Sequence, residues 1–259
     1  MTDLQITTLA QRPELAERLW DMKDPWPEFA QHDSVAWLLY PRMTRELADY
    51  VLVATDGDAV VARGYSVPFA LHAPGRDGVL PARGWDQVLM WAFSDLRRGI
   101  APDTVSAIEI TIATDRQGEG LSARMLAAMR DNARSRGFAE VVAPVRPSGK
   151  PAEPDTPIRE YAYRTREDGL PYDPWLRVHA RAGAVIDSVA PLSMTITGSL
   201  AQWREWTGLP FDATGPVRVP GALAPVRCEL EQGYAVYVEP NVWVRHALDR
   251  PEQAAPVRA

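Results

Sequence analysis

The 259-residue sequence is poor in cysteine and has no long apolar run. Its single thiol, Cys228, cannot form an intramolecular disulfide or a thiolate metal cluster, which indicates a reducing compartment. No stretch approaches the roughly 18 apolar residues that a membrane helix needs. Residues 1–20 carry acids and lack the apolar core of a signal peptide. We therefore expect a cytoplasmic protein without a membrane partner.

Basic residues are also scarce. Lys and Arg number 28 against 34 Asp and Glu, so the net charge is −6. Nucleic-acid binding relies on clustered cations, and a nucleic-acid partner is therefore not expected. A local site for a small phosphorylated ligand is compatible with this charge. The four histidines are too scattered to indicate a metal site, and none is predicted: His32, His72, His179 and His246.

Proline, by contrast, is plentiful, with 23 residues concentrated in 144–174 and 210–225. Proline breaks helices and strand ladders, so these segments are predicted loops. Hydrophobic periodicity predicts helices at 13–22, 34–48, 85–93, 121–133 and 175–182. It predicts strands at 50–54, 60–67, 107–113, 141–145, 184–189, 193–197, 225–230 and 234–239. We expect one domain over 1–259, with a long inserted loop at 146–174 and a C-terminal hairpin extension.

The most informative segment joins a strand to a helix. Residues 107–113 alternate and are β-branched, while apolar residues recur every fourth position over 121–133. The connection, residues 114–122, contains Gly118 and Gly120. A helix N-terminus offers free N–H groups and the positive end of the macrodipole, and glycines let the backbone approach closely. This pattern predicts a main-chain site for phosphate.

Two common phosphate loops fit less well. A Walker loop fails, because Gly149-Lys150 is followed by Pro151 and lacks the earlier glycine. Gly118-x-Gly120-x-x-Ala123 matches a dinucleotide fingerprint, but no ribose-binding acid stands near Val145, where the second strand ends.

The pattern Gln117-x-x-Gly120-x-Ser122 resembles the acetyl-CoA signature of the GCN5-related N-acetyltransferase superfamily. The resemblance covers residues 106–145 well and 173–197 weakly, and Ser122 is a mild departure at a position for small residues. Two further segments resemble acetyltransferase domains found fused to nitrilase-like hydrolases, a second domain for which this chain has no room: 168–179 and 237–246.

The resemblance implies an α/β (α+β) acyl-CoA N-acyltransferase fold. In it, a mixed twisted sheet flanked by helices has a V-shaped opening between parallel strands at 107–113 and 140–145. Acetyl-CoA would be the cosubstrate, and an amine or related nitrogen nucleophile of a small molecule would attack its thioester directly. The backbone of Ile112, Ala113 and Thr114 would pair with the pantetheine arm. The pyrophosphate would be held by the amides of Gln117, Gly118, Glu119, Gly120, Leu121 and Ser122.

Three residues are candidates for catalysis. The superfamily often carries a glutamate on the strand before the loop as general base, which implies that role for Glu109; a paired structural glutamate is the alternative. Family members commonly place a tyrosine, as general acid, four residues before a helix-ending glycine. Here His179 stands four residues before Gly183. His179 could protonate the thiolate, it could be structural, or the role could lie with a tyrosine of the preceding loop: Tyr161, Tyr163 or Tyr172.

Other features leave alternatives open. The loop 146–174 is either a lid or a solvated insertion. The acceptor pocket could be lined by Trp26, Trp37 and Tyr40, which could equally be core, and Cys228 is expected in the core. A homodimer is compatible with the sequence. The competing functions are a coenzyme-binding module without efficient chemistry and a nucleotide-dependent oxidoreductase.

Overall fold

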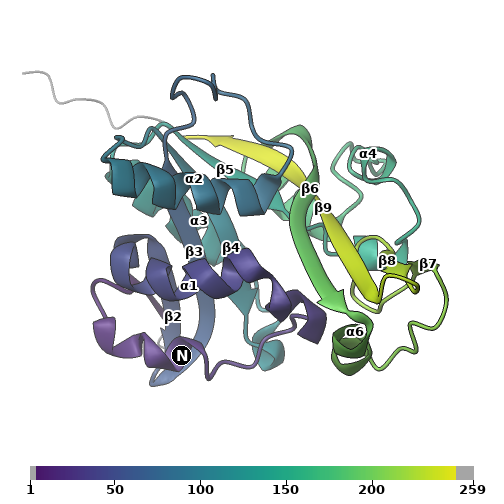
Figure 1. Cartoon of the computed structure of the whole chain (residues 1–259). Helices are drawn as coiled ribbons and strands as arrows, with labels where there is room; N and C mark the ends of the chain where they lie inside the picture. Colours follow the sequence, from purple (N-terminus) through teal and green to yellow (C-terminus); the bar gives the residue numbers. More distant parts are fainter. Residues whose placement is uncertain (1–3, 249–259) are drawn as a thin grey trace, which may run out of the picture.

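The computed structural model describes residues 4–248, which form a twisted mixed sheet of nine strands (Figure 1). The strands follow the order β1-β2-β3-β4-β5-β9-β8-β7, and β6 also pairs with β9. Their bounds are β1 Leu4–Thr8, β2 Val51–Asp56, β3 Ala59–Phe69, β4 Thr104–Ile112, β5 Glu140–Val145, β6 Val185–Ser199, β7 Gly215–Val217, β8 Val226–Glu229 and β9 Tyr234–Ala247. Every pairing is antiparallel except that of β4 with β5.

The α-helices are α1 Ser34–Glu46, α2 Gly84–Arg98, α3 Leu121–Ser135, α4 Ile158–Tyr161, α5 Pro174–Arg181 and α6 Leu200–Thr207. Short 3₁₀ helices span Pro13–Leu15, Glu17–Leu19, Glu28–His32, Ala48–Tyr50, Thr114–Arg116 and Lys150–Ala152. Between residues 4 and 248, no helix has the length and apolarity needed to cross a bilayer.

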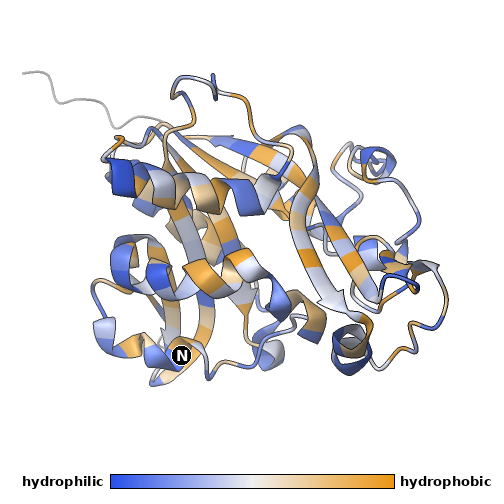
Figure 2. Ribbon diagram, viewed as in Figure 1, coloured by the Kyte–Doolittle hydropathy of each residue, from blue (hydrophilic) through white to orange (hydrophobic). Residues whose placement is uncertain are grey.

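Each face of the sheet carries its own core. Helices α1 and α2 cover one face (Figure 1), and their apolar side chains pack with those of β3 and β6. Helices α3 and α5 belong to the core on the other face. Figure 2 shows apolar and polar residues alternating along β6 and β9, as expected when successive side chains point to opposite faces. The sheet is therefore sandwiched between helices, as the resemblance implied.

The parallel strands β4 and β5 separate soon after they begin. They pair at two positions only: Val105↔Val141 and Ser106↔Val142. Beyond them, the Trp85 indole donates to the Ile108 carbonyl at 3.1 Å, which occupies an acceptor that a longer ladder would need. Pro144 on β5 has no N–H to donate. The opposite edge of β5 is paired with β9 along its whole length. The predicted V-shaped opening is thus confirmed.

Two predicted elements at the ends of the chain differ from the structure. Residues 13–22 contain two 3₁₀ helices, Pro13–Leu15 and Glu17–Leu19, instead of one α-helix, because the amides of Ala16 and Trp20 donate to carbonyls three residues back. Residues 184–189 and 193–197 are one strand, β6, interrupted by irregular pairing. The C-terminal hairpin forms between β8 and β9, but β9 then continues into the middle of the sheet between β5 and β6.

The connection 146–174 is well packed. Lys150 is buried, and its ammonium donates to three carbonyls, including that of Leu223 at 2.7 Å. Asp173 caps α5 and accepts from the Tyr161 hydroxyl at 3.0 Å. A lid role for this connection stays a prediction. Cys228 is buried in the core, as expected.

Two buried acids lie where α1 and α2 begin. Asp33 caps α1 by accepting from the Ala36 amide at 2.7 Å, and Asp86 lies in the first turn of α2. Within the described residues, each leaves one carboxylate oxygen without a hydrogen bond. Burial and the neighbouring Asp33 charge raise the pKa of Asp86 to about 8, with a smaller contribution from Glu239; Arg83 and the Thr195 backbone oppose this.

We predict that Asp86 makes the fold less stable as pH rises. Its folded pKa of about 8 lies above the ordinary value of 3.8, so the stability linked to its proton is lost between these two values. Asp86→Asn carries no charge, and its melting temperature should fall less from about pH 5 to about pH 9 than that of the unaltered protein. The exposed Asp58→Asn is the control. Parallel stability curves for Asp86→Asn and the unaltered protein would contradict the assignment.

Candidate active site

Three cavities meet at the opening between β4 and β5. The N-terminal cavity, of about 600 Å³, lies against α1 and residues 20–31. The loop cavity, of about 550 Å³, lies against residues 116–122 and α5. A central cavity of about 70 Å³ shares Trp26, Trp85, Glu109 and Met194 with the first, and Trp26, Ile110, Arg146 and Trp175 with the second. The central cavity thus borders both large cavities.

The loop cavity has a main-chain cradle at the start of α3. Gly118 and Gly120 have φ angles of +85° and +75°, and a Cβ added to either would meet nothing within 4 Å. In the described part of the chain, the amides of residues 117–123 donate to no protein acceptor. Free N–H groups at the N-terminus of a 15-residue helix, with open space before them, suit a pyrophosphate.

The predicted coenzyme-binding residues divide into two groups. Those that line the loop cavity are Ile112, Gln117, Gly118, Gly120, Leu121 and Ser122. Ala113 and Thr114 do not line it, because their amides already donate to the carbonyls of Val61 at 2.9 Å and Lys23 at 3.1 Å. Glu119 also lies outside its lining and pairs with Arg116. Since backbone groups alternate along a strand, Ile110 and Ile112 present theirs to the opening instead.

Three further residues line the loop cavity without having been expected there; one of them, Trp26, was expected at the acceptor pocket or in the core. Trp26, Arg146 and Trp175 line it. The Arg146 guanidinium carbon lies 5.4 Å from the centroid of the Trp26 ring, and its Nε donates to the buried Glu239 at 3.0 Å. Burial alone would lower the pKa of Arg146, but the Glu239 carboxylate outweighs it and raises that pKa. A fixed cation therefore stands at the border of the central and loop cavities.

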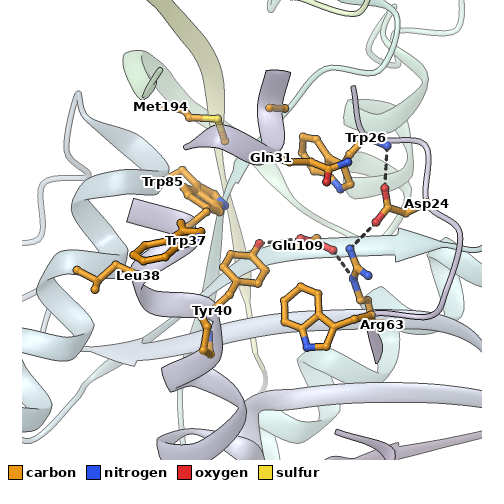
Figure 3. A pocket seen from close by; sticks show the side chains of 14 residues that line it. Asp24, Trp26, Gln31, Trp37, Leu38, Tyr40, Arg63, Trp85, Glu109 and Met194 are labelled. Carbon is orange, nitrogen blue, oxygen red and sulfur yellow. Dashed lines mark hydrogen bonds and ion pairs between the residues drawn. The ribbon is translucent and has the colours of Figure 1, made fainter. Parts of the chain in front are cut away.

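Glu109 stands at the inner end of the N-terminal cavity (Figure 3). Its Oε1 accepts from Arg63 Nε at 2.9 Å and from Thr111 Oγ1 at 2.7 Å, and its Oε2 accepts from the Tyr40 hydroxyl at 2.7 Å. Burial and the Glu109 charge raise the pKa of Tyr40 well above its usual value, so Tyr40 is a donor. A carboxylate has about four acceptor positions. One position on Oε2 is consequently free for a ligand.

The Arg63 guanidinium contacts three groups at this end of the cavity, of which Glu109 is one. It also donates to Asp24 at 2.7 Å and to the Leu19 carbonyl at 3.0 Å. Burial alone would lower the pKa of Arg63, but Glu109 and Asp24 outweigh burial and raise it. Two carboxylates therefore face one guanidinium, which leaves a net negative charge. The wall is aromatic, with Trp20, Trp26, Trp37, Tyr40 and Trp85. Such a cavity suits a cation that can donate a hydrogen bond.

The other two catalytic candidates lie in different surroundings. His179 is buried beside the central cavity, with its Nδ1 2.9 Å from Nε2 of His246. Burial and the neighbouring His246 lower the pKa of His179 to about 3, and burial lowers that of His246 to about 4. Both imidazoles are neutral near pH 7. Tyr163 is 53% exposed and is absent from the lining of all three cavities in the described structure. The opening thus brings Glu109 and His179 together and leaves Tyr163 outside.

Sequence reasoning missed Arg63 and Thr111. Arg63 interrupts an otherwise apolar strand, and strand alternation puts Thr111 on the same face as Glu109. These two signals could have found them.

No family model matches the chain. An arginine N-acetyltransferase of Aspergillus versicolor, AvaD, is 32% identical over a 275-residue alignment that covers 94% of this chain and 93% of that protein. The loading GNATL domain of CurA from Lyngbya majuscula shares the fold, with a TM-score of 0.56, 17% identity and coverage of 95% and 98%. The GNAT-like decarboxylase GphF, in complex with isobutyryl-CoA, has a TM-score of 0.50, 17% identity and coverage of 94% and 98%. The similarity to domains fused to nitrilase-like hydrolases stays a prediction.

Gly120→Glu should abolish coenzyme A binding, because the added carboxylate fills the cradle and repels phosphate. Gly208→Glu is a matched control: Gly208 has a similar φ of +70° and open space around it, but it ends α6. Isothermal titration with coenzyme A, alongside melting temperatures, separates loss of the site from backbone strain common to both variants. Unchanged affinity in Gly120→Glu would remove residues 117–122 from the site.

Proposed function

The chain belongs to the GCN5-related N-acetyltransferase superfamily, and we propose that it acetylates a cationic nitrogen nucleophile that enters through the N-terminal cavity. The observation that carries this proposal is the position of Glu109, which lines both the N-terminal and the central cavity with one acceptor position free. A nitrogen that binds there lies beside the opening through which the coenzyme would reach.

Acetyl-CoA fits the opposite side. The amides of residues 117–122 would hold its pyrophosphate, and the free backbone groups of Ile110 and Ile112 would pair with its pantetheine arm. The coenzyme supplies an acetyl group activated as a thioester. Arg146, Trp26 and Trp175 border the passage from this site to the central cavity, where they would exclude water.

Glu109 has two tasks in this proposal. Its charge, together with that of Asp24, attracts the protonated nitrogen, and its free Oε2 position accepts one N–H. The nitrogen must lose a proton to attack a carbonyl carbon, and Oε2 is the atom placed to receive it, directly or through a water. Arg63 and Thr111 act on Oε1 and fix the direction in which Oε2 points.

The acceptor is a cation in this proposal, either an amine or a guanidinium. Aromatic faces and a net negative charge favour both. The relative of 32% identity is named for arginine, whose guanidinium is a planar cation with several N–H donors. A direct test follows coenzyme A release with acetyl-CoA and a panel of cations, including agmatine and putrescine, beside uncharged amides. Coenzyme binding without turnover on any cation would favour a binding module instead.

Glu109→Gln should lower kcat/KM for the best acceptor by about 10²–10⁴-fold, because it removes both the base and its charge. The affinity for acetyl-CoA should change little, since Glu109 does not line the loop cavity. The exposed Glu205→Gln is the control, and melting temperatures check folding. A pH–rate profile identical to that of the unaltered enzyme would count against Glu109 as the base.

We propose that His179 lines the central cavity as a neutral side chain and does not donate a proton, because its pKa is lowered to about 3. We expect His179→Gln to reduce kcat by less than about tenfold and to leave the alkaline limb of the pH–rate profile in place. A loss of kcat above a hundredfold, together with a shift of the alkaline limb of the pH–rate profile, would instead support His179 as the general acid.

A further inference from the structure

The N-terminal cavity changes character from its inner end to its rim. Glu109, Tyr40 and Trp85 at the inner end are buried. At the rim, Trp37 is 78% exposed, and Leu38, the next residue of α1, is 60% exposed. The charged groups therefore lie deep, and the apolar groups lie where a ligand would leave the cavity. Figure 3 shows Trp37 and Leu38 on the side of Tyr40 away from Arg63.

A third exposed side chain lines the cavity on the Arg63 side. Trp20 is 53% exposed, and the Arg63 guanidinium carbon lies 5.7 Å from its ring centroid. Large exposed aromatics gathered around one cavity are characteristic of a binding surface, since leaving them in water forgoes hydrophobic stabilisation. The volume of about 600 Å³ falls within the range of roughly 300–1,000 Å³ for drug-sized ligands. The occupant thus has an apolar part beside its cation.

The same cavity is poorly suited to a free carboxylate. Among the described residues that line it, Arg63 is the one Lys or Arg, and its charge is already matched by Glu109 and Asp24, which with the Leu19 carbonyl take three of its five N–H groups. The carboxylate of a free amino acid would therefore lie near two acids without a cation of its own, which is unfavourable. Gln31, exposed at the cavity, offers an amide that suits a neutral carbonyl or amide.

We propose that the acceptor is a cationic nitrogen joined to a large apolar body without a free carboxylate, and that this body packs on Trp37 and Leu38. This inference rests on the proposed function and narrows its substrate class. It selects amides and arylalkyl compounds over free amino acids. The cation would bind at Glu109 while the body covers the rim.

A matched set of compounds tests each part of the proposal. Nα-benzoyl-argininamide has the cation and the aromatic body, Nα-benzoyl-arginine adds a carboxylate, and Nα-acetyl-argininamide lacks the aromatic ring. The corresponding lysine compounds cover an amine acceptor. One series, arginine or lysine, should be acetylated with acetyl-CoA. In that series, we expect kcat/KM for the benzoyl amide to exceed the values for the benzoyl acid and for the acetyl amide by about tenfold or more, an energy difference of ~1.4 kcal/mol.

Trp37→Ala should bring the benzoyl amide to acetyl amide ratio close to one, since the ring loses its packing surface. Tyr234→Ala, another exposed aromatic on the β8–β9 hairpin, is the control and should leave the ratio as it is. Free arginine or lysine reacting as fast as the benzoyl amides would overturn this inference but leave the proposed function standing. Acetyl-CoA binding with no cation acetylated in either series would overturn both.

Discussion

The N-terminal cavity depends on the contacts that the Arg63 guanidinium makes. This group binds Glu109 on β4, Asp24 and the Leu19 carbonyl, and so joins the sheet to the segment before α1. A buried cation is tolerated only where its charge and its N–H groups have partners. These partners cannot move independently, because displacing any one of them leaves a buried donor unpaired. The segment 19–26 is thereby held against β4, and Trp20 and Trp26 become walls of the cavity.

Trp26 couples the two large cavities. Its indole N–H donates to Thr111 Oγ1 at 3.1 Å, and the same hydroxyl donates to Glu109 Oε1 at 2.7 Å. Because one hydroxyl both receives and donates, the orientation of the indole and the position of the carboxylate are set together. The other side of the ring contacts the Arg146 guanidinium at the border of the loop cavity. Acceptor and coenzyme would consequently meet against a single side chain.

The sequence predicted the elements around the loop cavity better than the contacts around the N-terminal cavity, for a physical reason. The strand at 107–113, the loop at 114–122 and the helix after it are recognisable from local periodicity and from glycines that permit positive φ. The network around Glu109 depends on contacts between residues that are far apart in the sequence. Arg63 lies 46 positions from Glu109, and Trp26 lies 85 positions from Thr111. A local sequence pattern does not reveal such contacts. Local pattern likewise does not reveal the bond from Arg63 to the Leu19 carbonyl, 44 positions away, at the end of the segment that was wrongly expected to be one α-helix.

The division of the site also accounts for how an acidic protein would bind an anionic coenzyme in the proposed function. Main-chain amides supply partial positive charge at the start of α3 without any lysine, so the net charge of −6 does not oppose the cradle locally. The carboxylates of Asp24 and Glu109 line the other large cavity and are absent from the loop cavity's lining. Arg146, which borders both the central and the loop cavity, is itself paired with Glu239. The acidic surface that disfavours nucleic acid therefore favours the approach of a cation. In the proposed function, the two substrates would be attracted by different physical means, so that binding of one would not oppose binding of the other.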